Sequence, residues 1–188
     1  MTEIPVRRQR MEIEYYVIPF ALHQIYKQQF LDEITRATST PVTEQGLQHI
    51  SRTDYFVSFE LNRTYMWLVK NRLYPYLEQA LRPLFPKIEL ASFWFQQYQT
   101  GDFHGTHDHR GGQTNYSSVY YLEMTPESSG TRLVTDWGQE INPKVSEGDI
   151  LIIPSTVKHY SPINKSTQTK TVLAMNIQLD NYPKFDRL

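Results

Sequence analysis

The sequence predicts a mainly β protein with N-terminal helices, arranged as a jelly-roll barrel that the helices buttress. Apolar residues recur at helical spacing through much of the first half of the chain, whereas from residue 88 onward short β-like runs alternate with glycine-containing turns. Many short strands separated by turns are typical of a sandwich or barrel. An H-x-H pair followed by a distant third histidine has the layout of a metal site in such a barrel.

The first half of the chain predicts one strand and two helices. The strand is expected over residues 12–18, and the first helix over 20–37. The second helix is expected over 61–84, where apolar residues form the stripe of an amphipathic helix. We expect Pro75 to kink this helix, and Pro83 and Pro86 to end it.

The second half predicts strands over residues 88–99, 117–124, 131–135, 150–153 and 169–179, with glycines in the intervening segments. A chain of 188 residues with 39% hydrophobic content can bury the core of one domain. We therefore expect a single domain over residues 1–188, with 1–87 as mainly helical support and 88–180 as the barrel core.

Composition excludes several kinds of site. The chain has no cysteine, which excludes disulfides, thiolate zinc sites and iron–sulfur ligation. The formal net charge is -1 and the charged residues are scattered, so neither a nucleic-acid groove nor a membrane patch is predicted. The sequence also shows no signal-peptide pattern and no apolar run long enough to span a bilayer, so we expect a cytoplasmic protein.

The candidate metal ligands are His107, His109 and His159. Successive side chains of an extended strand point to opposite faces, so His107 and His109 share a face while Asp108 points away. His159 follows a predicted buried strand and a proline, and should enter the same site from the start of another strand. Three imidazoles of this kind leave other metal positions open, which indicates catalysis rather than a structural site.

The identity of the third ligand has alternatives. A site of two histidines and one carboxylate would need Asp108 to turn inward, or a carboxylate from elsewhere such as Asp102 or Asp136. His104 lies three residues before His107 and should face away from it on a regular strand. We interpret His104 as a loop residue or as a residue that supports the ligands.

Four segments together resemble the non-haem Fe(II)/2-oxoglutarate oxygenases, in particular the prolyl-hydroxylase-like branch with its small bacterial and phage members. The resemblance covers about residues 90–180 and lies in order and spacing more than in any single motif. The segments are residues 94–109 (WFQQYQTGDFHGTHDH), 117–122 (SSVYYL), 148–155 (GDILIIPS) followed by His159, and 170–176 (KTVLAMN).

This resemblance implies a double-stranded β-helix in which two histidines and usually a carboxylate hold Fe(II). It implies 2-oxoglutarate and O2 as cosubstrates, with ascorbate helpful, and the coupling of 2-oxoglutarate decarboxylation to the hydroxylation of an unactivated C–H bond. Lys170 matches the basic residue that pairs with the far carboxylate of 2-oxoglutarate, and Tyr121 matches a tyrosine that assists it. Tyr98 and Asn176, from the same segments, are assigned to cosubstrate binding as well.

Each of these assignments has a structural alternative. Lys170 could be a surface lysine on an edge strand, and Tyr121 a core aromatic. The molecule to be oxidised is either a small molecule or a peptidyl side chain, and the sequence fixes neither this choice nor the oligomeric state.

The main alternative is a three-histidine cupin, an enzyme or a small-molecule binding module with the same barrel. His109 stands where the oxygenases usually have an acidic ligand, which favours this alternative. The spacing of Gly101 to His109, and of Gly148, Pro154 and His159, matches the two cupin motifs. The glutamate expected after H-x-H is absent, however, and Lys170 together with the N-terminal helices favours the oxygenase.

Overall fold

The computed structural model describes residues 7–10, 13–58, 63–112 and 114–180. Its strands are β1 (Arg7–Arg10), β2 (Glu14–Pro19), β3 (Thr40–Glu44), β4 (Gln48–Thr53), β5 (Lys87–Tyr98), β6 (Phe103–His107), β7 (Tyr116–Glu123), β8 (Arg132–Val134), β9 (Glu140–Ile141), β10 (Asp149–Pro154), β11 (Lys158–Ser161) and β12 (Lys170–Asp180). The helices are α1 (His23–Arg36), α2 (Met66–Leu68), the π-helical segment η1 (Val69–Leu73) and α3 (Tyr74–Leu81).

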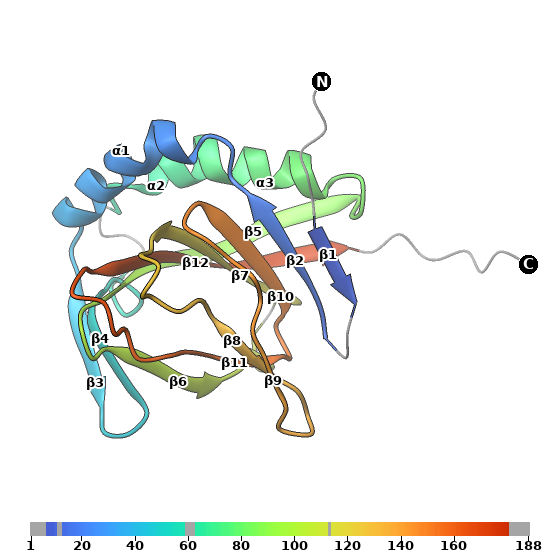
Figure 1. Ribbon diagram of the computed structural model, residues 1–188. Coiled ribbons are helices and arrows are strands. Elements are labelled where there is room, and N and C mark those ends of the chain that lie inside the picture. Colours follow the sequence, from blue (N-terminus) through green and yellow to red (C-terminus); the bar gives the residue numbers. More distant parts are fainter. Residues whose placement is uncertain (1–6, 11–12, 59–62, 113, 181–188) are drawn as a thin grey trace, which may run out of the picture.

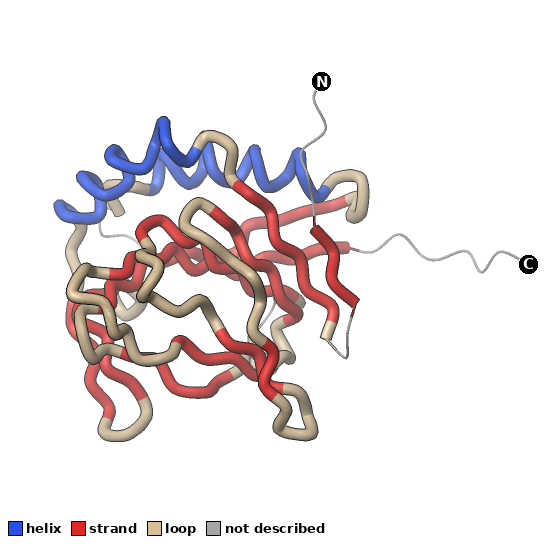
Figure 2. The backbone as a smooth tube through the Cα atoms, in the orientation of Figure 1, coloured by secondary structure: helices blue, strands red, loops and turns tan. Residues whose placement is uncertain are grey.

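The strands form one antiparallel sheet that curls on itself (Figure 1). The strand order is β1-β2-β10-β7-β12-β5-β4-β6-β11-β8-β9, with β3 paired to β4 beside this path. The helices lie together along one side of the sheet (Figure 2). This arrangement confirms the predicted fold class, a β barrel of the double-stranded β-helix type buttressed by helices.

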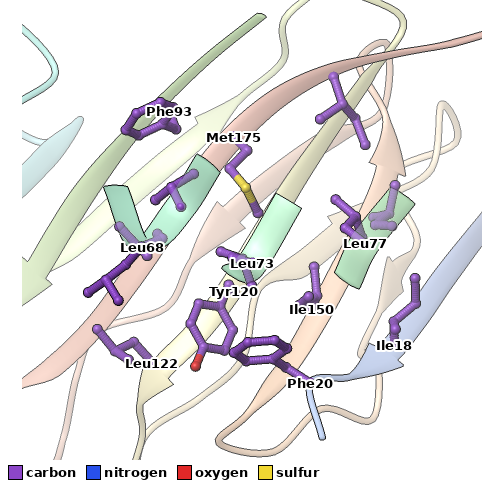
Figure 3. Close-up of a cluster of buried hydrophobic side chains, with 14 of the residues drawn as sticks. Ile18, Phe20, Leu68, Leu73, Leu77, Phe93, Tyr120, Leu122, Ile150 and Met175 are labelled. Atoms are coloured by element: carbon purple, nitrogen blue, oxygen red, sulfur yellow. The ribbon is translucent and has the colours of Figure 1, made fainter. Parts of the chain in front are cut away.

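Alternation along the strands divides the core into two parts. On β10, Ile150 and Ile152 pack toward the helices, whereas Leu151 and Ile153 face the interior of the barrel. On β7, Tyr120 belongs to the helix side, where it lies against Phe20 with ring centroids 5.5 Å apart (Figure 3). Because the helices cover only one face, the other face is left to form a pocket.

The second predicted helix continues through Pro75, where the sequence predicted a kink, and its winding changes just before that residue. Pro75 lies in the first turn of α3, and the residues just before it adopt the wider π-helical winding of η1. Proline has no N–H for a helical hydrogen bond and its ring crowds the preceding turn, so a local π segment accommodates it. The helix then ends at Leu81, before Pro83 and Pro86, as the sequence predicted.

The first 87 residues are less helical than expected, because they contribute β1 to β4 as well as the helices. The hairpin of β3 and β4 was not predicted, and β4 joins the barrel between β5 and β6. The predicted start of the first strand at residue 12, and that of the second helix at residues 61 and 62, lie outside the described residues. Among the described residues, no helix is long and apolar enough to cross a membrane.

Candidate metal centre and pocket

Three histidines converge where β6 meets β11. His107 ends β6 and lies directly opposite His159 of β11 in the antiparallel pairing. His109 lies two residues beyond β6, where its backbone N–H donates to the carbonyl oxygen of Ser155 at 2.8 Å. One ring nitrogen from each of the three histidines lies within 4.8 Å of the other two. The structure therefore brings together the three residues that the sequence proposed as ligands.

Backbone carbonyls fix the tautomer of two of these histidines. The Nδ1 of His107 lies 2.8 Å from the carbonyl oxygen of Gly105, and the Nδ1 of His159 lies 2.9 Å from that of Val157. A carbonyl oxygen can only accept, so each Nδ1 carries the proton and each Nε2 keeps its lone pair. This second hydrogen bond is the arrangement that orients metal-binding histidines in general.

Burial lowers the pKa of all three imidazoles, to about 3 for His159. The neighbouring His107 lowers the pKa values of His109 and His159 further, because two adjacent positive charges repel each other. The rings are therefore neutral at neutral pH, which is the state in which histidine binds a metal. Three neutral imidazoles with open positions fit a divalent transition metal such as iron.

His104 does not face away from His107, as regular strand alternation predicted. The two rings are stacked, with centroids 4.0 Å apart and planes 15° apart. The cause is a bulge in the β6–β11 pairing, where His107 lies opposite His159 but His104 lies opposite Ser161. His104 lines the pocket, and its burial lowers its pKa to about 3. It thus stacks on the ring of His107 without belonging to the three-histidine group.

No carboxylate belongs to that group within the described residues. Asp108 lies at the pocket but pairs with Arg110, whose Nε is 3.2 Å from Oδ2. Asp102 is buried and accepts a hydrogen bond from the backbone N–H of Ser51 at 3.0 Å. Asp136 is largely exposed and lies near Arg110. The acidic alternatives are therefore engaged elsewhere.

The histidines lie in the wall of a cavity of about 240 Å³ inside the barrel. Residues of β3, β4, β5, β6, β7, β11 and β12 line this cavity. The lining residues that bear on the chemistry are His104, His107, His109, His159, Gln96, Tyr98, Thr131, Ser161 and Lys170.

Lys170 is the buried cation of this cavity, and the surface-lysine alternative is wrong because only 2% of the residue is exposed. Its Nζ donates to the carbonyl oxygen of Ser129 at 2.7 Å and to the hydroxyl of Ser161 at 2.9 Å. Burial lowers its pKa to about 7. Among the described residues no carboxylate pairs with it. A buried cation without an anion is costly, so this end of the cavity is suited to a negatively charged group.

The three other residues assigned to cosubstrate binding have different positions. Tyr98 lines the cavity, with its ring centroid 5.2 Å from the Nζ of Lys170. The Tyr121 hydroxyl accepts from the backbone N–H of Thr131 at 3.0 Å, and Thr131 in turn lines the cavity. The side chain of Asn176 bonds to serines on β5 and β7 and does not line the cavity.

Sequence reasoning missed one wall of the cavity. It comes from the β3–β4 hairpin and the turn after it, with Val42, Gln48, Ile50, Thr53, Tyr55 and Phe56. The sequence carries little signal for this hairpin, because β4 has one apolar residue, Ile50, and the outer strand β3 is mostly exposed.

The structure was compared with known proteins. No family model matches the sequence, and no curated protein matches it. Among solved structures, an oxidoreductase of the 2OG-Fe(II) oxygenase family from Burkholderia pseudomallei matches with a TM-score of 0.68 and 11% identity, over 89% of this chain and 86% of that one.

Two further structures show the same fold. A prolyl-4-hydroxylase from Pseudomonas putida matches with a TM-score of 0.56 and 15% identity, over 95% of this chain and 94% of that one. The epimerase SnoN, in complex with Fe3+, alpha ketoglutarate and nogalamycin RO, matches with a TM-score of 0.68 and 12% identity, over 90% and 80% of the two chains. The chain therefore has the double-stranded β-helix fold of the 2-oxoglutarate- and iron-dependent oxygenases.

Proposed function

We propose that the protein is a non-haem Fe(II)- and 2-oxoglutarate-dependent oxygenase that hydroxylates an unactivated C–H bond and converts 2-oxoglutarate to succinate. One observation carries this proposal: three converging neutral histidines share one cavity with a buried lysine that pairs with no carboxylate in the part of the chain that the structure describes. A metal site alone would fit many barrels. The lysine adds a place for the carboxylate of a second, acidic molecule.

In this proposal His107, His109 and His159 hold the iron through their ring nitrogens. Bound iron supplies the redox chemistry by which O2 oxidises 2-oxoglutarate and then the substrate. The protein residues keep the imidazoles neutral, orient two of them through backbone carbonyls, and stack His104 on His107. Ascorbate would help by keeping the iron reduced.

Lys170 would hold the far carboxylate of 2-oxoglutarate. The Ser161 hydroxyl, already 2.9 Å from Nζ, is placed to contact the same carboxylate, and the Tyr98 ring covers the cation. A carboxylate beside Nζ favours the charged lysine, so cosubstrate binding would raise the lowered pKa of Lys170. Tyr121 would act indirectly, through its hydrogen bond to the backbone of Thr131, which lines the cavity. Asn176 we now interpret as a residue that ties β12 to β5 and β7.

The three-histidine cupin remains the second candidate, and His109 is the observation that favours it. With histidine in place of a carboxylate, a bound metal receives no negative charge from its protein ligands. The cupin alternative, however, gives no role to Lys170. Dependence of binding on this lysine therefore separates the two candidates.

The test is an anaerobic titration of Fe(II) with and without 2-oxoglutarate, followed by the weak visible charge-transfer band of the chelate. We expect the band in the wild-type protein only when both are present. Lys170→Met should weaken 2-oxoglutarate binding by a factor of roughly 30 to 100, the loss expected for one partner of a charged hydrogen bond. The exposed Lys144 provides the matched control, since Lys144→Met should bind like wild type. Equal affinity in Lys170→Met and wild type would favour the cupin.

A further inference from the structure

Three aromatic rings form one wall of the cavity. Trp94 of β5 is buried, whereas Tyr55 and Phe56 follow β4 and are 52% and 68% exposed. The ring centroid of Tyr55 lies 4.9 Å from that of Trp94 and 4.9 Å from that of Phe56, with interplanar angles of 67° and 86°. The rings thus form an edge-to-face row that runs from the buried part of the cavity to the solvent.

The turn that carries the two exposed rings is held by buried charges. Asp54 is 1% exposed, and its carboxylate accepts hydrogen bonds from the backbone N–H of Phe95 at 2.9 Å and from the hydroxyl of Tyr65 at 2.6 Å. Arg63, 5% exposed, places its Nε 3.3 Å from the same carboxylate. Burying an ion pair is costly unless hydrogen bonds and charge compensate for the lost water, and here two hydrogen bonds and one cation meet the Asp54 carboxylate. The turn that carries Tyr55 and Phe56 is therefore attached to β5 through the hydrogen bond between Asp54 and Phe95.

Among the described residues, the remainder of this wall is uncharged. Val42, Gln48, Ile50 and Thr53 line it beside the aromatic row. The charged lining residues lie elsewhere or are engaged: Asp108 pairs with Arg110, and Lys170 lies at the anion end. No described residue of the aromatic wall carries a charge that would compensate for the desolvation of a charged group.

Size restricts the occupant further. The cavity of about 240 Å³ is smaller than the roughly 300–1,000 Å³ of typical small-molecule sites. 2-Oxoglutarate at the Lys170 end would leave still less room inside the cavity for the molecule to be oxidised. The two exposed rings extend the contact surface beyond the cavity.

We propose that Tyr55, Phe56 and Trp94 bind an uncharged aromatic ring of the molecule to be oxidised. This inference rests on the proposed function and names the substrate class of the same site. A fourth ring would continue the edge-to-face row, the geometry that aromatic pairs prefer. The ring belongs either to a peptide side chain or to a free small molecule, since an aromatic ring from either source would make the same contacts with Tyr55, Phe56 and Trp94.

Ligand-observed NMR on the purified protein, with and without 2-oxoglutarate, tests this inference. The probes are para-cresol as a free ring, N-acetyl-tyrosinamide as a peptide-like ring, N-acetyl-leucinamide as an aliphatic control and N-acetyl-lysinamide as a charged control. We expect at least one aromatic probe to bind more tightly than both controls, and the better of the two aromatic probes identifies the source. Tyr55→Ala and Phe56→Ala should each weaken this binding by roughly 3- to 10-fold.

Trp137→Ala is the matched variant, because Trp137 is 84% exposed and does not line the cavity, so it should bind like wild type. Phe56→Lys, a surface change that places a charge in the row, should abolish aromatic binding without affecting the fold. Equal binding of the aliphatic control, or unchanged binding in the Tyr55 and Phe56 variants, would overturn the inference. The measurement needs neither iron nor turnover. If the protein binds the aromatic probe but forms no iron–2-oxoglutarate chelate, only the proposed oxygenase function is refuted. If it forms the chelate but does not bind the aromatic probe, only the inference of a ring-binding site is refuted.

Discussion

His107 and His159 lie directly opposite each other on β6 and β11, and their ring centroids are 4.3 Å apart. The register of the β6–β11 pair therefore brings two of the three candidate ligands together through strand pairing alone. A shift of one residue would turn one of the rings to the other face of the sheet. Two of the three candidate ligands therefore lie on paired strands, and His109 lies just beyond the end of β6.

Replacement of His109 by aspartate should strengthen iron binding. The carboxylate adds a negative charge next to a divalent cation, and we expect Fe(II) affinity to rise roughly tenfold, or about 1.4 kcal/mol. Anaerobic Fe(II) titration of His109→Asp measures this change in affinity. His109→Ala is the control, because it has no ligand atom at position 109. Equal Fe(II) affinity in the wild type, the aspartate variant and the alanine variant would show that residue 109 does not reach the metal.

The stack of His104 on His107 should stabilise both the fold and the site. His104→Ala leaves a gap behind His107, and we expect a loss of about 1–3 kcal/mol in the free energy of unfolding. His104→Phe keeps a flat ring and should restore most of this loss. Urea denaturation of the two variants provides the comparison. If alanine and phenylalanine destabilise equally, the stack contributes nothing and a polar contact of His104 matters instead.

Gly105 is required for the close approach of two backbones. A Cβ at this position would lie 2.3 Å from the carbonyl oxygen of Leu47, so the β3–β4 turn or β6 would have to move. Gly105→Ala should cost about 1–3 kcal/mol of stability and should also weaken Fe(II) binding, because the Gly105 carbonyl orients His107. Gly111→Ala, where no atom lies within 4 Å of the added Cβ, is the control. Wild-type behaviour of both variants would contradict this account.

Stability should depend on pH through Lys170. Burial lowers its pKa from 10.5 to about 7 in the folded protein, so between these values the unfolded chain binds more protons. Stability without 2-oxoglutarate should therefore rise by a few kcal/mol as the pH increases from about 7 to about 10.5. Thermal or urea unfolding across this range should show that the stability of the wild type rises relative to that of Lys170→Met, since the buried tyrosines that also titrate are common to both. Identical pH profiles would mean that the lysine has no lowered pKa.

The sequence was sufficient for the features that depend on spacing along single strands. The glycine-separated β runs predicted the barrel, and H-x-H with a distant histidine predicted which rings converge. Lys170 was identified by a family resemblance, and the structure confirms that it is buried in the cavity. Its role in cosubstrate binding is still a prediction.

The features that the sequence did not reveal depend on contacts between strands. A bulge between β6 and β11 turns His104 toward His107, and no residue type marks that bulge in the sequence. The β3 strand has little apolar character because most of it is exposed, so the hairpin that walls the cavity could not be distinguished from a loop. The aromatic row likewise joins Tyr55 to Trp94, which are far apart in the chain.

The most direct test of the central claim is the conversion of 2-oxoglutarate to succinate by the purified protein with Fe(II), ascorbate and O2. The account predicts slow succinate formation even without the molecule to be oxidised. It also predicts loss of this turnover in His159→Ala, with circular dichroism unchanged. A wild-type protein that binds Fe(II), yet forms no succinate and shows no spectral change with 2-oxoglutarate, would contradict the account.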